Sequence, residues 1–215
     1  MNVIFISPPA AGKGTQAEML SKDYNLYHLS TGDLLREVAN MDTFIGKSVK
    51  ELIDNGNFVS DELMFELLKE KINSLDNVNG IIFDGVPRTL EQVHMLDKLV
   101  NIDYVIYLDV EKEVAMKRAT GRVNCPMCNN IYNIYFDNIE DNKCNTCKVE
   151  LSKREDDREE KFNHRFDTYL LRTKPVVDYY NEKGILHVIK NIGTKYDIYE
   201  NIKSVINKGN NLWLT

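Results

Sequence analysis

The sequence predicts an α/β fold in which helices cover a parallel β-sheet. Two observations carry this prediction: short apolar runs alternate with helical patterns, and the first apolar run leads through a loop into a helix. A third observation adds a subdomain, because residues 122–153 break the alternation, are rich in asparagine and contain every cysteine of the chain. At 215 residues, the chain can bury one core and still carry such an insert.

Five apolar runs have the length expected of buried strands. They are residues 3–6, 27–29, 80–85, 104–109 and 185–189. The first run, VIFI, ends in Ser7-Pro8-Pro9, which is typical of a central strand that enters a loop. These runs predict a five-stranded sheet.

Helical patterns fill the intervals between the strands and follow the last one. They cover residues 12–22, 32–40, 43–54, 60–74, a stretch that opens at 89–92, and then 111–121, 156–183 and 197–207. Ser60 is expected to cap its helix, with acidic residues in the first turn, and Thr89 and Gln92 match a capping box. Pro175 predicts a kink in the stretch 156–183.

Composition narrows the classes of function. The net charge of -6 and the pI near 5.3 argue against a broad nucleic-acid-binding surface, although a few converging arginines can still bind a small anion. The sequence lacks an apolar run of roughly 18 residues, the length that crosses a membrane. The first residues lack the basic and small-residue features of a signal peptide. We therefore expect a cytoplasmic location and no membrane partner.

The cysteines predict a structural metal site. Cys125 and Cys128 form one C-x-x-C pair, Cys144 and Cys147 form another, and 15 residues separate the pairs. This spacing is typical of a four-thiolate zinc site, in which no coordination position stays open for catalysis. Iron or a metal-free insert are the alternatives. An insert of about thirty residues buries too little apolar surface to fold alone, so the metal substitutes for a core.

The stretch SPPAAGKGTQ (residues 7–16) is similar to a phosphate-binding loop but departs from G-x-x-x-x-G-K-[ST]. Ser7 replaces the first glycine, and Gly14 separates Lys13 from Thr15. Lys13 would reach phosphates and the Thr15 hydroxyl would face Mg²⁺, whereas the alternative is an ordinary turn with an exposed lysine. Two prolines stiffen the loop, and Ala10 is predicted to have a negative φ.

Two further stretches place polar residues at the carboxyl edge of the predicted sheet, where ligands bind in such folds. Residues 30–36 (STGDLLR) supply two hydroxyls, an acid and an arginine. Residues 84–88 (DGVPR) supply a carboxylate and an arginine directly after a buried strand. An aspartate at a strand end is the usual second support for Mg²⁺ in phosphate-loop enzymes.

With these motifs in place, the sequence resembles adenylate kinases. The residues that carry the resemblance are A-G-K-G-T-Q (11–16), S-T-G-D-x-L-R (30–36), D-G-x-P-R-T (84–89), G-R (121–122) and R-x-D-D (154–157). The resemblance implies a three-layer phosphate-loop nucleoside-monophosphate kinase fold. Its parts would be a core of residues 1–29, 60–120 and 159–215, an AMP-binding subdomain of residues 30–59, and a zinc-binding lid of residues 121–158.

The resemblance also implies an activity, which is the reversible transfer of the γ-phosphoryl group of Mg·ATP to AMP, giving two ADP. The substrates would be ATP, AMP and ADP, and the protein would be a monomer. Mg²⁺ would be held by Asp84 and Asp33 through water, and structural Zn²⁺ by the four cysteines. The catalytic residues implied are Lys13, Asp84, Arg88, Arg122, Arg154 and Arg165.

The same resemblance assigns residues to two nucleotides. The ATP-binding residues implied are Ala10, Ala11, Gly12, Lys13, Gly14, Thr15, Arg118, Arg122, Ile131, Tyr132 and Lys195. The AMP-binding residues implied are Thr31, Arg36, Asn57, Phe58, Val59, Gly85, Val86, Pro87, Arg88, Gln92, Arg154 and Arg165. Val86 departs from the phenylalanine common in the family, which loosens one wall of the acceptor pocket.

Each of these residues could instead have a purely structural role. The arginines could lie on solvated helix faces, Gln92 could be only a capping residue, and Ile131 and Tyr132 could pack within the small domain. Three rival functions are also open. The chain could be a related kinase with another donor or acceptor base, a zinc-ribbon protein that binds nucleic acid or acts as a switch, or a nucleotide-binding protein without turnover.

Overall fold

The core of the protein is a five-stranded parallel sheet, as the apolar runs predict. The computed structural model describes residues 1–76 and 78–211. The strands lie in the order β2-β3-β1-β4-β7, and every neighbouring pair is parallel. Their bounds are β1 Val3–Ile6, β2 Tyr27–Ser30, β3 Ile81–Asp84, β4 Tyr104–Asp109 and β7 Leu186–Lys190.

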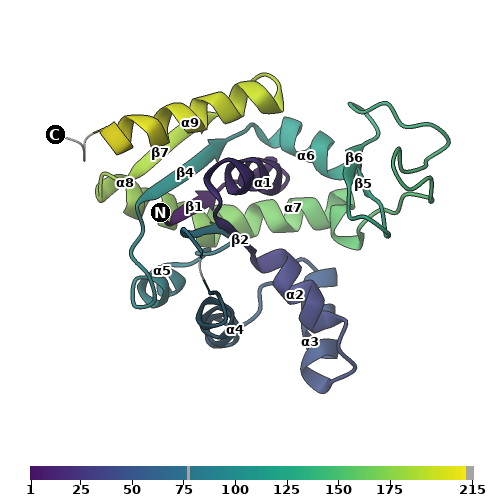
Figure 1. The fold of residues 1–215 in the computed structure, drawn as a ribbon. Coiled ribbons are helices and arrows are strands. Elements are labelled where there is room, and N and C mark those ends of the chain that lie inside the picture. The colour runs from purple at the N-terminus through teal and green to yellow at the C-terminus, as the bar shows by residue number, and fades with distance from the viewer. Residues whose placement is uncertain (77, 212–215) are drawn as a thin grey trace.

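Helices cover both faces of this sheet and give three layers (Figure 1). Alternate residues of β1 divide between two apolar cores, with Val3 and Phe5 in one and Ile4 and Ile6 in the other. Side chains alternate between the faces of a strand, so a strand covered on both sides is apolar throughout. The helices are α1 Lys13–Tyr24, α2 Thr31–Ala39, α3 Phe44–Asp54, α4 Asp61–Asn73, α5 Leu90–Leu96, α6 Lys112–Thr120, α7 Glu159–Thr168, α8 Lys174–Glu182 and α9 Lys195–Asn211.

Side-chain caps fix where several helices begin. The hydroxyls of Ser30, Thr43, Ser60 and Thr89 each accept a hydrogen bond from the backbone N–H three residues later, at 3.0 to 3.2 Å. Each bond satisfies one of the N–H groups that a helix start leaves without a partner. The expected caps at Ser60 and Thr89 are thus confirmed.

The stretch predicted to run over 156–183 differs in detail. A short 3₁₀ turn, Glu155–Asp157, precedes α7, and a π-helical segment, Tyr169–Thr173, joins α7 to α8. The irregularity therefore lies just before Pro175 rather than at it. Pro175 has no N–H for the carbonyl four residues back, and a widened turn upstream accommodates that missing bond.

The cysteine-rich insert forms a small unit of loops that extends to one side of the body (Figure 1). Its regular structure is an antiparallel pair, β5 Arg122–Asn124 and β6 Ile131–Asn133. Its buried centre consists of two cysteines with Val123 and Leu151. Across residues 1–76 and 78–211, the helices are too short or too polar to traverse a bilayer.

The position of Phe83 in β3 gives a stability prediction. Its side chain is fully buried, and Phe83→Ala is expected to lower the free energy of unfolding by about 3–5 kcal/mol, because it leaves a cavity between sheet and helices. Phe44 is 86% exposed at the start of α3, so Phe44→Ala is the matched control and is expected to change stability by about 0.5 kcal/mol or less. Chemical denaturation of both variants measures the difference, and equal losses would contradict this account of the core.

Candidate active site

The phosphate loop joins β1 to α1 and ends at Gly12, the N-cap of α1. Gly12 has a φ of 84°, which glycine adopts without strain. Glycine also has no side chain to cap the helix, so the first N–H groups of α1 are left for an anion, which a helix N-terminus favours. The N–H of Gln16 donates to the Gly12 carbonyl at 3.2 Å, so the helix hydrogen bonds begin directly at the loop.

Ala10 contradicts the prediction made from the sequence. The sequence predicts a negative φ, but Ala10 lies in the left-handed region with a φ of 58°. For an alanine this conformation costs about 1–2 kcal/mol. Ala10 and Gly12 together turn the chain from Pro8-Pro9 into α1, and both are left-handed. The path of the loop therefore overrides the preference of the alanine.

Lys13 and Asp84 face each other where β1 and β3 end. Lys13 Nζ lies 3.6 Å from Asp84 Oδ1, and His28 Nε2 lies 3.2 Å from Asp84 Oδ2. Burial lowers the pKa of Lys13, and Arg88 and Arg165 lower it further against the attraction of Asp84. Burial opposes ionisation of Asp84, but Lys13 and His28 outweigh it and hold the pKa of Asp84 below its usual value. Asp84 is therefore an ionised, nearly buried carboxylate.

The predicted arginines converge on the same region. Burial lowers the pKa of Arg88 to about 10, and Arg165 and Arg36 add to that shift. Burial also lowers the pKa of Arg154 to about 10, together with the charges of Arg122 and Arg36. Neighbouring arginines from separate segments therefore add to the effect of burial on both groups. An anion placed among them would relieve the repulsion.

Carboxylates from the R-x-D-D motif hold two of these arginines. Arg122 donates to both oxygens of Asp157, at 2.7 and 2.5 Å, and Arg165 donates to Asp156 at 2.7 Å. The first pair is bidentate, and its acid is almost fully buried. Arg154 has no hydrogen-bonded carboxylate among the described residues and is attracted by these two acids only at longer range. Among the described residues, the group of arginines therefore contains at least one cation, Arg154, that is not hydrogen-bonded to a carboxylate.

Asp33 does not join Asp84. Its carboxylate lies in the first turn of α2, is mostly exposed, and accepts a hydrogen bond from Arg36 at 2.5 Å. Burial opposes its ionisation, but Arg36 and Ser30 lower its pKa overall. The two acids expected to hold Mg²⁺ therefore differ: Asp84 lies at the sheet edge beside Lys13, and Asp33 is engaged by an arginine.

Thr31 and Gly85 pack together on the acceptor side. The Thr31 hydroxyl is fully buried and donates to the Asp84 carbonyl at 3.3 Å. A side chain at Gly85, which has a φ of 94°, would lie 2.4 Å from that hydroxyl, so only glycine fits. Val86 is 1% exposed and belongs to the apolar core, as does Val59. Pro87 is also buried, after a cis peptide bond.

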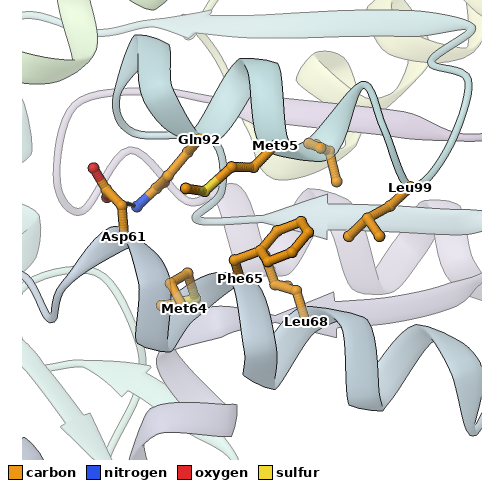
Figure 2. A pocket seen from close by; sticks show the side chains of 8 residues that line it. Asp61, Met64, Phe65, Leu68, Gln92, Met95 and Leu99 are labelled. Atoms are coloured by element: carbon orange, nitrogen blue, oxygen red, sulfur yellow. Dashed lines mark hydrogen bonds between the residues drawn. The ribbon is translucent and has the colours of Figure 1, made fainter.

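Gln92 is held at both ends of its amide. Oε1 accepts from the backbone N–H of Arg88 at 2.8 Å, and Nε2 donates to Asp61 Oδ1 at 2.7 Å. Figure 2 shows Gln92 and Asp61 together at one end of the small apolar cavity between α4 and α5. The capping box is therefore modified, because the glutamine accepts from the residue before the N-cap. A backbone N–H only donates and a carboxylate only accepts, so the amide has one orientation.

Phe58 lies beneath two guanidinium groups. The ring centroid is 5.1 Å from Arg88 Cζ and 5.3 Å from Arg172 Cζ. Arg88 also donates through Nε to the Gly85 carbonyl at 2.6 Å. Neighbouring Asn57 is exposed and pairs with His164 at 2.9 Å, so the segment before α4 touches both the sheet edge and α7. Phe58, Arg88 and Gly85, three of the residues predicted for the acceptor, therefore lie together.

Four residues predicted to bind ATP lie outside the phosphate loop and have different surroundings. Arg118 donates to Asn191 Oδ1 at 3.0 Å, and burial lowers its pKa. The Lys195 carbonyl accepts from Gln16 at 3.0 Å, while its ammonium lies over Tyr196. Ile131 is exposed on the insert. Tyr132 faces inward, where its hydroxyl lies 3.3 Å from Cys144 Sγ, which matches packing within the small domain.

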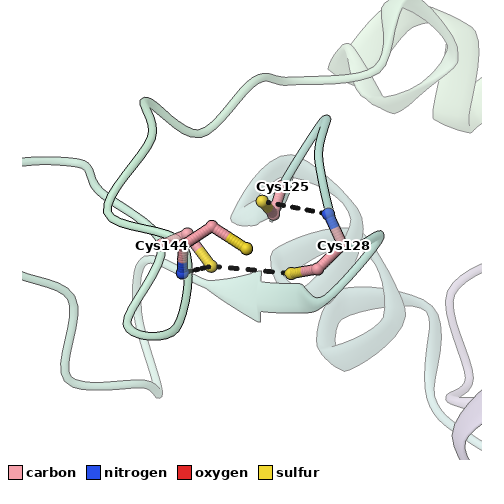
Figure 3. Close-up of side chains that lie close together, drawn as sticks. Cys125, Cys128 and Cys144 are labelled. Carbon is pink, nitrogen blue, oxygen red and sulfur yellow. Dashed lines mark hydrogen bonds between the residues drawn. The ribbon is translucent and has the colours of Figure 1, made fainter.

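The four cysteines form a single cluster, and Figure 3 labels three of them, Cys125, Cys128 and Cys144. Their sulfur atoms all lie within 4.8 Å of one another, and Cys125 and Cys144 are buried. The N–H groups of Cys128 and Cys147 point back to the first sulfur of each pair, at 3.4 and 3.3 Å. The N–H of Cys147 and the Tyr132 hydroxyl lower the pKa of Cys144 to about 6, which favours a thiolate. Four converging sulfurs form a donor set that suits zinc.

Three residues of this region carry no role in the sequence analysis. His28 could have been found, because it lies two residues before Ser30, which pairs with Asp84 in the parallel register and so shares its face. Asp61 and Arg172 have no local signal. They meet Gln92 and Phe58 only because α4, α5 and the π-helical segment after α7 pack together.

Comparisons with known proteins agree with this geometry. A family model described as "Adenylate kinase" matches residues 5–185. An adenylate kinase of Archaeoglobus fulgidus is 41% identical over 214 residues, which covers 97% of this chain and 99% of that protein. Those of Thermodesulfovibrio yellowstonii and Thermotoga petrophila are 37% and 40% identical, and cover 97% and 94% of this chain and 100% and 96% of their own lengths.

The charge of Arg154 gives a prediction about stability. Arg154→Met is expected to raise the free energy of unfolding of the ligand-free protein by about 1 kcal/mol, because it removes a partly buried cation that faces other arginines. The same change should weaken the binding of ATP. Arg158 is exposed and paired with Glu155, so Arg158→Met is the control and is expected to change stability by about 0.5 kcal/mol or less. Thermal unfolding of the ligand-free variants measures both changes in stability. An Arg154→Met variant that is less stable than the wild type would contradict the prediction.

Proposed function

The chain belongs to the adenylate kinase family and is an ATP:AMP phosphotransferase, and we propose that it performs the transfer with the residues assembled above. The observation that carries the proposal is the convergence of Lys13 and several partly buried arginines near the carboxyl edge of the sheet. A cluster of cations with too few acids suits a ligand that carries several negative charges. Two nucleotides that meet through their phosphates are such a ligand.

The donor nucleotide lies along the phosphate loop in this proposal. The N–H groups at the start of α1 and the Lys13 ammonium would bind the ATP phosphates, and the Thr15 hydroxyl would be available to Mg²⁺. Mg²⁺, which the family uses with ATP, neutralises charge on these phosphates. Asp84 is our choice to hold it through water, since it is ionised and offers the hard oxygen donors that Mg²⁺ prefers. Asp33, paired with Arg36, fits this role less well.

Transfer of the phosphoryl group depends on how the two nucleotides are positioned and on the positive charge around them, more than on proton transfer. An oxygen of the AMP phosphate forms a bond to the γ-phosphorus of ATP while the bond to the β-phosphate oxygen breaks. The attacking oxygen is already anionic, so no general base is required. Arg88, Arg154 and Arg165 stabilise the charge that spreads over the transferred group. Arg122 is bound by Asp157 and contributes from a fixed place.

Gln92 chooses the acceptor base in this proposal, with Thr31 and the backbone of residues 57–59 and 85. The single orientation of its amide leaves one lone pair on Oε1 and one hydrogen on Nε2. Adenine offers an amine and a ring nitrogen, which match that pair. Guanine and hypoxanthine offer the reverse pattern. Asp61 therefore supports adenine recognition by preventing the amide from flipping.

The division of the chain follows from these roles. We propose a core of residues 1–29, 60–120 and 159–215, an acceptor subdomain of residues 30–59 and a lid of residues 121–158. Closure of the lid over ATP would exclude water and limit hydrolysis. Arg122 and Arg154 lie near the two ends of the lid, so closure would also move their charges relative to the phosphates.

Zinc in the lid is part of the proposal. The thiol cluster supplies four ligands, and the small apolar centre around Val123 and Leu151 is too limited to hold the lid alone. The metal would act only on structure, since the cysteines fill a tetrahedral site. We further propose a monomer in the cytoplasm with no nucleic-acid or membrane partner. The acidic composition supports the part of this proposal that concerns nucleic acid.

Acceptor choice is the first test of the proposal. With Mg·ATP, AMP is expected to support ADP formation with a kcat/KM about 100-fold or more above that of GMP, CMP or UMP. The Gln92 amide matches the amine and ring nitrogen of adenine and opposes the reversed pattern of guanine and uracil, whereas the smaller ring of cytosine presents its similar pair at a different place. Gln92→Leu should raise the KM for AMP about tenfold and leave the KM for ATP unchanged. A coupled assay for ADP measures both.

Glu91→Gln is the control, because Glu91 lies in the same helical turn but is exposed. Absence of turnover with every acceptor would refute the phosphotransfer, and turnover with a different acceptor alone would refute the assignment of AMP. Equal changes in both KM values for Gln92→Leu would refute its role in base recognition.

Metal content is the second test. We expect one zinc per chain, and removal by a chelator should lower the midpoint of thermal unfolding of the lid by about 5 °C or more, reversibly on addition of zinc. Cys144→Ser should lose the metal without loss of the parallel sheet, which circular dichroism would report. A content well below one zinc per chain in protein purified without chelator would remove this claim.

A further inference from the structure

Asn191 is a buried asparagine directly after β7, and the activity described above gives it no role. Its side chain is 6% exposed. Nδ2 donates to the Ala11 carbonyl at 2.5 Å, and Oδ1 accepts from Arg118 Nη1 at 3.0 Å. Its backbone N–H donates to the Asp109 carbonyl at 2.9 Å, which fixes its main chain to the end of β4. Both ends of a buried amide are therefore used, and its orientation is determined.

These contacts join two parts of the ATP site. Ala11 belongs to the phosphate loop between β1 and α1, whereas Arg118 lies in the last turn of α6. A guanidinium only donates hydrogen bonds and a carbonyl only accepts them. The asparagine amide can bind both at once, because its oxygen accepts from Arg118 and its NH₂ group donates to Ala11. An aliphatic side chain of similar size would leave the carbonyl and the guanidinium without this partner.

The contact to the loop adjoins its strained residue. Ala10 is left-handed at a φ of 58°, a conformation that an alanine leaves easily unless its surroundings hold it. Asn191 fixes the peptide group between Ala11 and Gly12, one residue further on. The bond therefore opposes relaxation of the loop at Ala10. A glycine at position 10 would need less of this support.

We propose that Asn191 is a positioning residue for ATP, which holds the phosphate loop in its left-handed turn and keeps Arg118 beside it. The inference rests on the proposed role of the loop and of Arg118 in ATP binding. It predicts an effect on one substrate only, because the contacts of Asn191 lie on the donor side, away from Gln92 and Thr31.

The test is Asn191→Val in the full-length protein, which removes both bonds with little change in volume. Titration with ATP alone, without AMP, should show about tenfold weaker binding, and steady-state kinetics should show a similar rise in the KM for ATP. The KM for AMP should change less than twofold. Ile192→Val is the matched control, because Ile192 is 76% exposed in the same loop, and it should leave both constants unchanged.

A second comparison separates a positioning role from general destabilisation. The loss of ATP binding caused by Asn191→Val should shrink at least threefold in the Ala10→Gly background, because glycine adopts the left-handed turn without help. Equal rises in both KM values, or the same loss of ATP binding with and without the Ala10→Gly change, would overturn the proposal. Wild-type protein that binds ATP but fails to phosphorylate AMP would refute the proposed function and leave this inference intact.

Discussion

Repulsion between partly buried cations is the constraint on which the active site of this protein depends. Lys13, Arg88, Arg154 and their neighbours come from separate segments and meet at one edge of the sheet, although burial and mutual charge both oppose it. The folded chain can hold such a group only if other interactions fix the segments. The two-sided apolar packing of the sheet supplies that rigidity, and the acids at 156 and 157 neutralise part of the charge. What remains is a positively charged site, which suits the phosphates of the proposed substrates.

Local signals predict most of the framework. Apolar runs locate every strand of the parallel sheet, because a strand that is buried on both faces consists almost entirely of apolar residues. Ser60 and Thr89 mark helix starts since a hydroxyl cap acts within three residues. The cysteine spacing predicts the cluster for a similar reason, because each pair depends on one tight turn.

Features that depend on distant contacts have no such local signal. The sequence predicts for Ala10 the φ that alanine prefers, but the turn into α1 imposes the opposite sign. The resemblance predicts that Tyr132 contacts ATP, but its hydroxyl lies against a cysteine of the insert. Gln92 matches a capping pattern, yet its amide is shared between Arg88 and Asp61, which lies on another helix. In each case the deciding atom lies outside the local segment, so no pattern along the chain could show it.

The π-helical segment 169–173 links two helices that serve different cores. Phe162 and Phe166 of α7 pack in one apolar cluster, whereas Val176 and Tyr180 of α8 pack in the other, across the sheet. Successive residues of a regular helix are rotated by about 100°, so one residue more or fewer turns everything beyond it by that angle. The widened turn sets the rotational phase between the two helices. Insertions and deletions in this segment are therefore constrained, since a single residue gained or lost would turn one of the two apolar faces toward water.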